Sequence, residues 1–235
     1  NKKIDLIVIA VVSKGIEWAS NEISKVLKSN VPILILTKGL AINNNNYEVL
    51  AHKMERLLKK NGMKETNISA AGGPCLAKNL ANKAHTAVVF ANNDIKIAEK
   101  ISKLVSTDYY HVSTSDDVVG VEACAAIKNI FSMAVGASQG LCDANQSKEK
   151  NYLNTAAALM QESIYEMITF VEKLKGKKET VIGLAGIGDL YVSADGGRNS
   201  KMGELLGQGM TFQEAKKTKM PNITVEGADL ALEIG

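Results

Sequence analysis

A single lysine stands in the middle of a long apolar stretch. Residues 120–138 read GVEACAAIKNIFSMAVGAS and have the length and composition of a helix, with Lys128 near its centre. The positions three, four and seven residues away from Lys128 share its helix face, and none of them carries a charge. The nearest acid, Glu122, is six residues back and lies about 120° round the helix. Lys128 therefore has no partner on its own face.

Such a lysine suits proton transfer. Burying an unpaired ammonium group costs several kcal/mol or lowers its pKa toward neutrality, which is what a general acid or base requires. Asn129 follows directly and offers an amide for hydrogen bonding. The alternative is that the stem of Lys128 lies along the core while its ammonium group reaches water. Because the stretch is apolar on nearly every side, we favour the catalytic interpretation.

Three other segments place small or polar residues directly after short apolar runs. Ser13 follows the run at 6–11, Lys38 and a glycine follow the run at 31–36, and Gly73 and Cys75 follow the run at 67–71. Each could be an ordinary turn. In a parallel sheet, however, the carboxyl ends of strands share one edge, where ligands bind. The glycine-rich turn also precedes a short helical pattern, so its amides suit an anion or a carbonyl group.

A glycine-rich segment at 183–209 carries the remaining candidates. Its first fifteen residues are too rich in glycine for a regular element, and we expect a helix to begin at about Arg198. Arg198 and Asn199, behind Gly197, form a candidate phosphate clamp at that helix start. Asp189 is expected in a tight turn. The alternative is that Asp189 caps this turn and Arg198 pairs with an acid.

Composition excludes several classes of function. The chain has 235 residues, 46% of them hydrophobic, and a net charge of +3 without a long basic run, which argues against a nucleic-acid partner. Three cysteines without a CxxC spacing indicate a reducing compartment, and three scattered histidines predict no metal site. Charged residues interrupt the longest apolar stretch, so no membrane insertion is expected. We expect a soluble, cytoplasmic protein.

The elements that must position these residues differ between the two halves. Strands are predicted at 6–11, 31–36, 67–71, 86–91 and 109–113, alternating with helices at 15–28, 47–61 and 94–105. Continuously apolar strands are typical of a doubly wound α/β sheet covered on both faces. The second half is predicted to be helical, with a helix at 154–174, so we expect one domain at 1–115 and another at 116–235. Residues 43–46 and 140–150 are predicted to be polar loops.

Six of these segments together resemble the NAD(P)-dependent glycerol-3-phosphate dehydrogenases. They are TKG at 37–39, GP at 73–74 followed by Ala77, GVE…KN at 120–129, AGIGDL at 185–190, GGRN at 196–199 and VEG at 225–227. Their order and separations match, and the resemblance runs from about residue 5 to the end. The adjacent lysine and asparagine distinguish this family from the related 3-hydroxyacid and 6-phosphogluconate dehydrogenases. The implied fold is a partial Rossmann-like doubly wound sheet followed by an all-α substrate domain of the 6-phosphogluconate-dehydrogenase-like type.

The resemblance implies interconversion of dihydroxyacetone phosphate and sn-glycerol 3-phosphate, with NAD or NADP as cofactor. By position, Lys128 resembles the family's proton donor and acceptor at the C2 oxygen, and Asp189 the acid that orients it. Lys38 resembles a lysine that contacts both substrate and cofactor. The other implied substrate-binding residues are Gly73, Cys75, Asn129, Gly197, Arg198 and Asn199. The other implied cofactor-binding residues are Ser13, Ala77, Arg198 and Glu226, and no metal is implied.

The sequence also departs from the family pattern. It contains no GxGxxG, so we expect a strand, a glycine-rich turn and further strands to precede this segment in a complete member, and helices to follow it. Cys75 replaces a hydroxyl residue, and Ser193 stands where threonine is frequent. The resemblance implies a homodimer. The alternative functions are reduction of another small phosphorylated or carboxylated substrate, and a non-catalytic relative.

Overall fold

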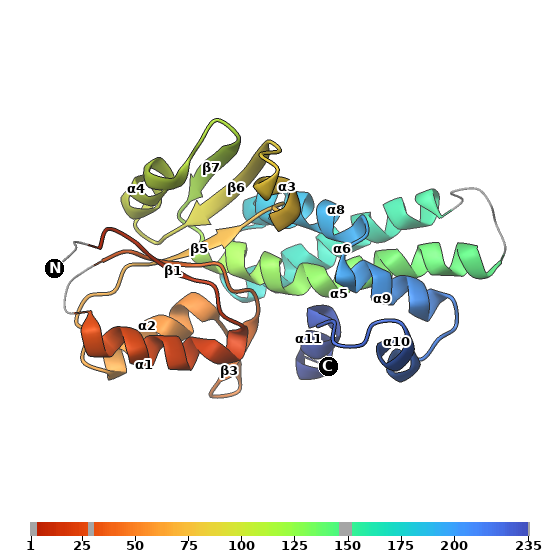
Figure 1. Ribbon diagram of the computed structural model, residues 1–235, viewed down its shortest axis with the longest axis horizontal. Coiled ribbons are helices and arrows are strands. Elements are labelled where there is room, and N and C mark those ends of the chain that lie inside the picture. Colours follow the sequence, from red (N-terminus) through yellow and green to blue (C-terminus); the bar gives the residue numbers. More distant parts are fainter. Residues whose placement is uncertain (1–3, 28–30, 146–151, 235) are drawn as a thin grey trace.

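The first half of the chain is built on a mixed sheet. In the computed structural model, which describes residues 4–27, 31–145 and 152–234, five strands lie in the order β1-β2-β5-β6-β7 (Figure 1). Strands β1, β2 and β5 are mutually parallel, β6 is antiparallel to β5, and β7 is parallel to β6. The strands comprise β1 (Ile7–Ile9), β2 (Ile33–Ile35), β5 (Ile68–Gly72), β6 (Thr86–Ala91) and β7 (Tyr110–Ser115).

The sheet is parallel except at one pairing, that of β5 with β6. A parallel connection needs a crossover that runs back along the whole strand, usually on a helix. Between β5 and β6 the chain has only the five-residue helix α3 (Ala77–Ala81), which is too short to return along a strand of five residues. The chain therefore turns back and enters β6 from the same edge.

Helices cover both faces of the sheet, as predicted. On one face lie α1 (Ile16–Val26), which follows a 3₁₀ turn η1 (Ser13–Gly15), and α2 (Leu50–Lys60). On the other face lies α4 (Ile95–Val105), whose Ile101 packs with Leu34 and Phe90. Asp94 begins α4 by accepting a hydrogen bond from the backbone N–H of Lys96. The start of α4 at this aspartate agrees with the sequence prediction.

A β-hairpin lies where the sequence predicted a loop and the start of a helix. Strands β3 (Leu40–Asn43) and β4 (Asn46–Val49) pair antiparallel, and α2 begins only at Leu50. The turn between them has positive φ at Asn44 and Asn45, 49° and 60°, which is the geometry that asparagine tolerates in tight hairpins. Tyr47 of the hairpin contacts the ring of Phe170 in the second half.

The second half is helical, as predicted. The helices are α5 (Val118–Ala144), α6 (Leu153–Lys173), α7 (Lys178–Val181), α8 (Asp189–Ala194), α9 (Arg198–Gly207), α10 (Phe212–Thr218) and α11 (Glu226–Ile234), with a π-helical turn η2 (Leu184–Gly188) before α8.

Two local expectations in this half were wrong. The loop predicted at 140–150 is helical as far as Ala144, because α5 continues, and residues 146–150 lie outside the described part. The glycine-rich segment at 183–197 was predicted to be irregular, but η2 and α8 occupy most of it. At Gly186 a β-carbon would lie 1.9 Å from the carbonyl oxygen of Val181, so this glycine permits close packing rather than interrupting the helix.

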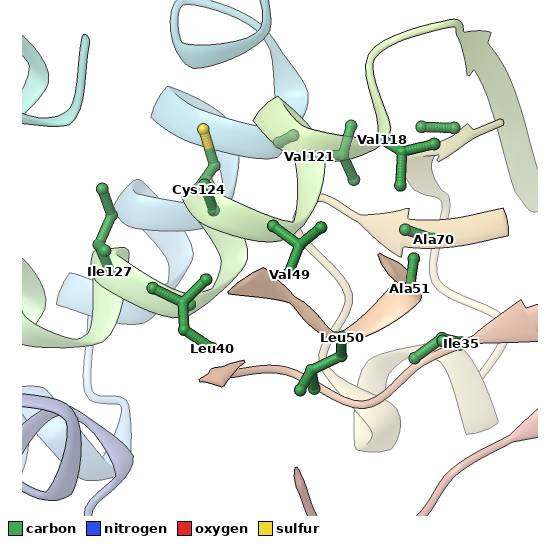
Figure 2. Close-up of a cluster of buried hydrophobic side chains, with 14 of the residues drawn as sticks. Ile35, Leu40, Val49, Leu50, Ala51, Ala70, Val118, Val121, Cys124 and Ile127 are labelled. Carbon is green, nitrogen blue, oxygen red and sulfur yellow. The ribbon is translucent and has the colours of Figure 1, made fainter. Parts of the chain in front are cut away.

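Helix α5 is the core helix of the molecule. Figure 2 shows α5, with Val118, Val121, Cys124 and Ile127, lying beside the hairpin, the start of α2 and the sheet, whose residues belong to the same apolar cluster. One apolar cluster thus extends across both halves of the chain. By length and composition alone α5 could cross a membrane, but 67% of its most apolar window is buried inside the protein, as in a core helix.

Glycines allow α5 and α9 to cross in close contact. On α5, a β-carbon at Gly136 would lie 2.1 Å from the carbonyl oxygen of Ser200. On α9, a β-carbon at Gly203 would lie 1.9 Å from that of Met133. The two backbones therefore touch without intervening side chains, so the N-terminus of α9 is held at a fixed distance from α5.

We expect Gly203→Ala to destabilise the protein by about 1–3 kcal/mol, because the added methyl group must push α9 away from α5. Chemical denaturation would measure this change. The matched control is Gly183→Ala, since a β-carbon there would make only ordinary contacts, the nearest at 3.4 Å. Equal effects at the two positions would contradict the close-packing explanation.

Candidate active site

The ammonium group of Lys128 is buried and paired. Its side chain is 6% exposed, and Nζ donates hydrogen bonds to Asp189 Oδ1 at 2.5 Å and to Ser193 Oγ at 2.6 Å. Both acceptors lie on α8, not on α5. The prediction that Lys128 is buried without a partner on its own helix face is therefore confirmed, and the alternative of an ammonium group that reaches water is wrong.

Asp189 binds a second lysine with its other oxygen. Lys38 follows β2, and its Nζ donates to Asp189 Oδ2 at 3.0 Å. The carboxylate is 3% exposed, whereas the side chain of Lys38 is 37% exposed. When both lysines are protonated, the three groups carry one uncompensated positive charge beside a partly open side chain. This arrangement favours an anionic or strongly polar ligand.

The surroundings of Lys128 shift its pKa toward neutrality. Burial lowers the pKa most, and the positive charge of Lys38 lowers it further. The carboxylate of Asp189 acts in the opposite direction, and the resulting pKa is about 8. A group with this pKa exchanges its proton readily near physiological pH, which is the property of a general acid or base.

The residues predicted at the carboxyl ends of strands do gather at one edge of the sheet. They follow β1, β2 and β5, which are parallel to one another. A β-carbon at Gly39 would lie 3.3 Å from Cβ of Ser13, so the turns after β1 and β2 touch. Gly39 also has φ of +135°, which favours glycine.

Cys75 lies close enough to the two charged groups for both to act on it. Burial raises the pKa of its thiol, while the charge of Lys38 lowers it and that of Asp189 raises it. Gly73 is buried in the turn before Cys75, and Ala77 is exposed as the first residue of α3. No described hydrogen bond joins the side chain of Cys75 to Lys38 or Asp189.

Two asparagines join the helices around the site. Asn199 of α9 donates from Nδ2 to Asn129 Oδ1 at 3.1 Å, and its own Oδ1 accepts from the backbone N–H of Gly227 at 2.8 Å. All of these groups are buried. A β-carbon at Gly227 would lie 2.5 Å from the carbonyl oxygen of Asn129, which explains why glycine ends the VEG motif. The pair thus connects α5, α9 and α11.

Arg198 pairs with an acid, as the alternative interpretation held. Its Nη2 donates to Glu226 Oε1 at 2.5 Å, and the Arg198 side chain is 58% exposed. Helix α9 begins here, with Gly197 as its N-cap. The second carboxylate oxygen of Glu226, Oε2, is buried and has no hydrogen-bond partner among the described residues. No described contact joins Arg198 to Lys38 or Lys128.

Sequence reasoning missed the acceptor role of Ser193. Asp189 and Ser193 are four residues apart, a spacing that puts both on one face of a helix. The segment was expected to be irregular, so this spacing was not used. Its expected turn at Asp189 was wrong as well, because this residue is the first of α8.

Among the described residues, no group of three His, Cys, Asp or Glu side chains is arranged to hold a metal ion. The polar groups of the site are instead ammonium groups, a carboxylate, a hydroxyl and amides. Such a set has the chemistry needed to bind an organic anion and to transfer a proton.

Known proteins share this architecture. A family model described as NAD-dependent glycerol-3-phosphate dehydrogenase C-terminus matches residues 117–234, and the corresponding N-terminus model matches residues 1–98. The chain is 31% identical over 211 residues to an NADP(+)-dependent glycerol-3-phosphate dehydrogenase of Archaeoglobus fulgidus. It is 34% identical over 214 residues to a glycerol-3-phosphate dehydrogenase [NAD(P)+] of Clostridium tetani.

These matches cover most of the chain but only part of the relatives. Each includes 90% of this chain, which spans 61% of the Archaeoglobus protein and 57% of the Clostridium protein. The crystal structure of glycerol-3-phosphate dehydrogenase from Coxiella burnetii superposes with a TM-score of 0.82 at 29% identity. That comparison covers 98% of this chain and 66% of the Coxiella chain.

We expect Asp189→Asn to lower the pKa of Lys128 below about 8, because the carboxylate is the group that favours its charged form. The rate of acetylation of Lys128 at different pH values, followed by mass spectrometry, would report this shift. Asp195→Asn, which neutralises an exposed acid just after α8, is the control and should leave the titration of Lys128 in place. An unchanged midpoint in Asp189→Asn would contradict the pairing.

Proposed function

Because the chain belongs to the NAD-dependent glycerol-3-phosphate dehydrogenase family, we propose that the complete protein interconverts dihydroxyacetone phosphate and sn-glycerol 3-phosphate, using NAD or NADP. The observation that carries the proposal is the buried Lys128, paired with Asp189 beside the more exposed Lys38. A reductase of a ketone needs a proton donor at the carbonyl oxygen, and a lysine with a pKa of about 8 can serve in both directions.

Lys128 acts at the C2 oxygen of the substrate. In the direction of reduction, its ammonium group donates a proton to the oxygen as hydride adds to C2, and it becomes a neutral amine. In the direction of oxidation, the amine accepts the hydroxyl proton as hydride leaves C2. Burial lowers the free-energy difference between the two forms of Lys128 at neutral pH, so neither direction starts from a strongly disfavoured state.

Asp189 and Lys38 hold the reacting groups in place. The carboxylate of Asp189 accepts from both ammonium groups, so it sets the direction in which Lys128 presents its proton. Lys38 is the more exposed of the two lysines and supplies a positive charge that stabilises the oxyanion developing at C2. Ser193 accepts from Lys128 and limits its rotation.

The N-terminus of α9 is the proposed site for the substrate phosphate. Gly197, Arg198 and Asn199 offer backbone N–H groups, a guanidinium group and an amide there. Contacts between Asn199 and Asn129 hold this helix end to the helix that carries Lys128. Gly73 and Cys75 form the opposite wall, on the turn after β5. In this arrangement α9 binds the phosphate, Lys128 of α5 binds the C2 oxygen, and the hydrogen bond between Asn199 and Asn129 joins the two helices.

The residues present fit a nicotinamide cofactor, which would supply or accept the hydride. The buried Oε2 of Glu226 lacks a hydrogen-bond partner among the described residues, and a donor such as a carboxamide N–H would satisfy it. Arg198, bonded to the other oxygen of Glu226, adds positive charge for a phosphate. Ser13 and Ala77, after β1 and β5, complete the proposed cofactor contacts.

The proposal also covers the domains of the protein, its location in the cell and its oligomeric state. Residues 1–115 form part of a dinucleotide-binding domain, and residues 116–235 form the substrate domain. The protein acts in the cytoplasm as a homodimer on a small phosphorylated substrate, without nucleic acid or membrane insertion. Support comes from the change in architecture between β7 and α5 and from the family.

We expect the complete gene product to oxidise NADH or NADPH when dihydroxyacetone phosphate is added, and Lys128→Met to lower kcat by about 10²- to 10⁴-fold, the range typical for a lost general acid. Absorbance of the reduced cofactor measures both rates and shows which cofactor is preferred. Lys100→Met, which removes an exposed lysine of α4, is the control and should retain the parent activity. If the parent protein is folded but inactive with dihydroxyacetone phosphate, this would falsify the assigned substrate. Other small phosphates and carboxylates should then be assayed.

The pH dependence should differ between the two directions. We expect kcat/KM for reduction to fall as the pH rises above about 8, because the free enzyme then loses the ammonium form of Lys128. For oxidation, kcat/KM should fall below about pH 8, because the amine form is then lost. Initial rates between pH 6 and pH 10 in both directions, roughly two units on either side of the midpoint, would test this. Profiles that move the same way in both directions would rule out Lys128 as the shared acid and base.

A further inference from the structure

The molecule contains a second buried ionisable side chain that the proposed mechanism does not use. Glu122 lies on the same helix as Lys128 and is only 4% exposed. It does not pair with Lys128. One of its oxygens, Oε2, accepts a hydrogen bond from the backbone N–H of Ala51 at 2.8 Å, and the other, Oε1, has no partner among the described residues. Burial raises the pKa of this carboxyl to about 8.

The partner of Glu122 is the first turn of α2. The N–H groups at a helix start lack acceptors within the helix, and a side chain at the N-cap usually supplies one. In α2 the N-cap is Val49, whose side chain cannot do so. Glu122 provides the acceptor from another helix. Figure 2 shows Val49 of this corner next to α5, and Val49, Leu50 and Ala51 belong to the same apolar cluster as residues of α5.

This contact bears on both lysines of the site. Lys38 stands at the start of the segment that leads through the β3–β4 hairpin into α2. Lys128 lies six residues after Glu122 on α5, roughly 9 Å along the helix axis at the usual rise. The bond from Ala51 to Glu122 therefore ties the segment that carries Lys38 to the helix that carries Lys128. Both lysines must reach the same carboxylate of Asp189.

Stability alone gives little reason to keep a carboxyl group here. A buried carboxyl with one unsatisfied oxygen carries a desolvation cost, and an apolar side chain of similar volume is often tolerated or stabilising at such positions. The local surroundings of Glu122 are otherwise those of the apolar core. The group is better explained by what its hydrogen bond positions.

We propose that Glu122 is a positioning residue, whose hydrogen bond to the N–H of Ala51 sets the placement of Lys38 relative to Lys128 for the reaction. The inference rests on the proposed function, since it concerns the same site. It assigns to the acid of the GVE segment a role that the sequence did not suggest, because Ala51 is 71 residues away.

The test compares three substitutions in the complete gene product. Glu122→Gln keeps an oxygen that can accept from Ala51, so it should retain at least a third of the parent's kcat. Glu122→Met removes the acceptor at similar volume, and Glu122→Asp withdraws it by one methylene group; both should lower kcat tenfold or more. The melting temperature of Glu122→Met should stay at or above that of the parent. Glu166→Met, on the exposed face of α6, is the matched control.

A second measurement does not depend on turnover. If Lys38 moves away from Lys128, the positive charge that lowers the pKa of Lys128 is weakened. The acetylation midpoint of Lys128 should then rise above about 8 in Glu122→Met and Glu122→Asp, but not in Glu122→Gln. Parent-like kcat and a parent-like midpoint in Glu122→Met would overturn the inference. A parent that is idle with dihydroxyacetone phosphate would overturn the proposed function instead, and the acetylation comparison would still decide whether Glu122 positions Lys128.

Discussion

The buried carboxylate of Asp189 is the group on which the site depends. It is 3% exposed and accepts from two ammonium groups, one of them almost as deeply buried. A charge removed from water is tolerated only where partners lie within hydrogen-bond distance, so small displacements of either lysine would be costly. The three side chains come from the end of β2, from α5 and from the start of α8. Their meeting therefore constrains the relative placement of the sheet and the helices.

Close backbone contacts satisfy that constraint. The glycines at the crossing of α5 and α9 bring these helices together without side chains between them, and Gly227 allows α11 to approach the carbonyl oxygen of Asn129. Interiors packed in this way have few alternative arrangements. The amide pair of Asn129 and Asn199 then bridges helices that are already in contact. As a result, the proposed phosphate site and the proposed proton donor, Lys128, lie on helices that are in direct contact.

The sheet supplies the other side of the site. Its three parallel strands end at one edge, and the turns that follow them carry Ser13, Lys38 and Cys75. The reversal at β6 keeps the short connection after β5 at this edge, because the chain does not cross the sheet before it re-enters. The hairpin and the start of α2 then pack on α5, where Glu122 meets Ala51. A hydrogen bond thus joins the segment after Lys38 to the helix that carries Lys128.

The sequence by itself determined those helices and strands that depend only on side chains a few residues apart. The apolar strands, the start of α4 at Asp94 and the helix around Lys128 follow from side-chain patterning and capping, which act over a few residues. It also singled out Lys128, because an unpartnered lysine on an apolar helix is visible without any fold. The combined motifs indicated the family, which the comparisons confirm.

Only the tertiary structure decided which groups meet. Asp189 and Lys38 are 151 residues apart, and Glu122 and Ala51 are 71 apart. No periodicity connects such positions, because their contact depends on how whole elements pack. The same holds for Gly186, which locally indicates a break in structure but in the fold allows η2 to pack closely against Val181. Local propensity yields to tertiary contacts where burial and hydrogen bonding outweigh it.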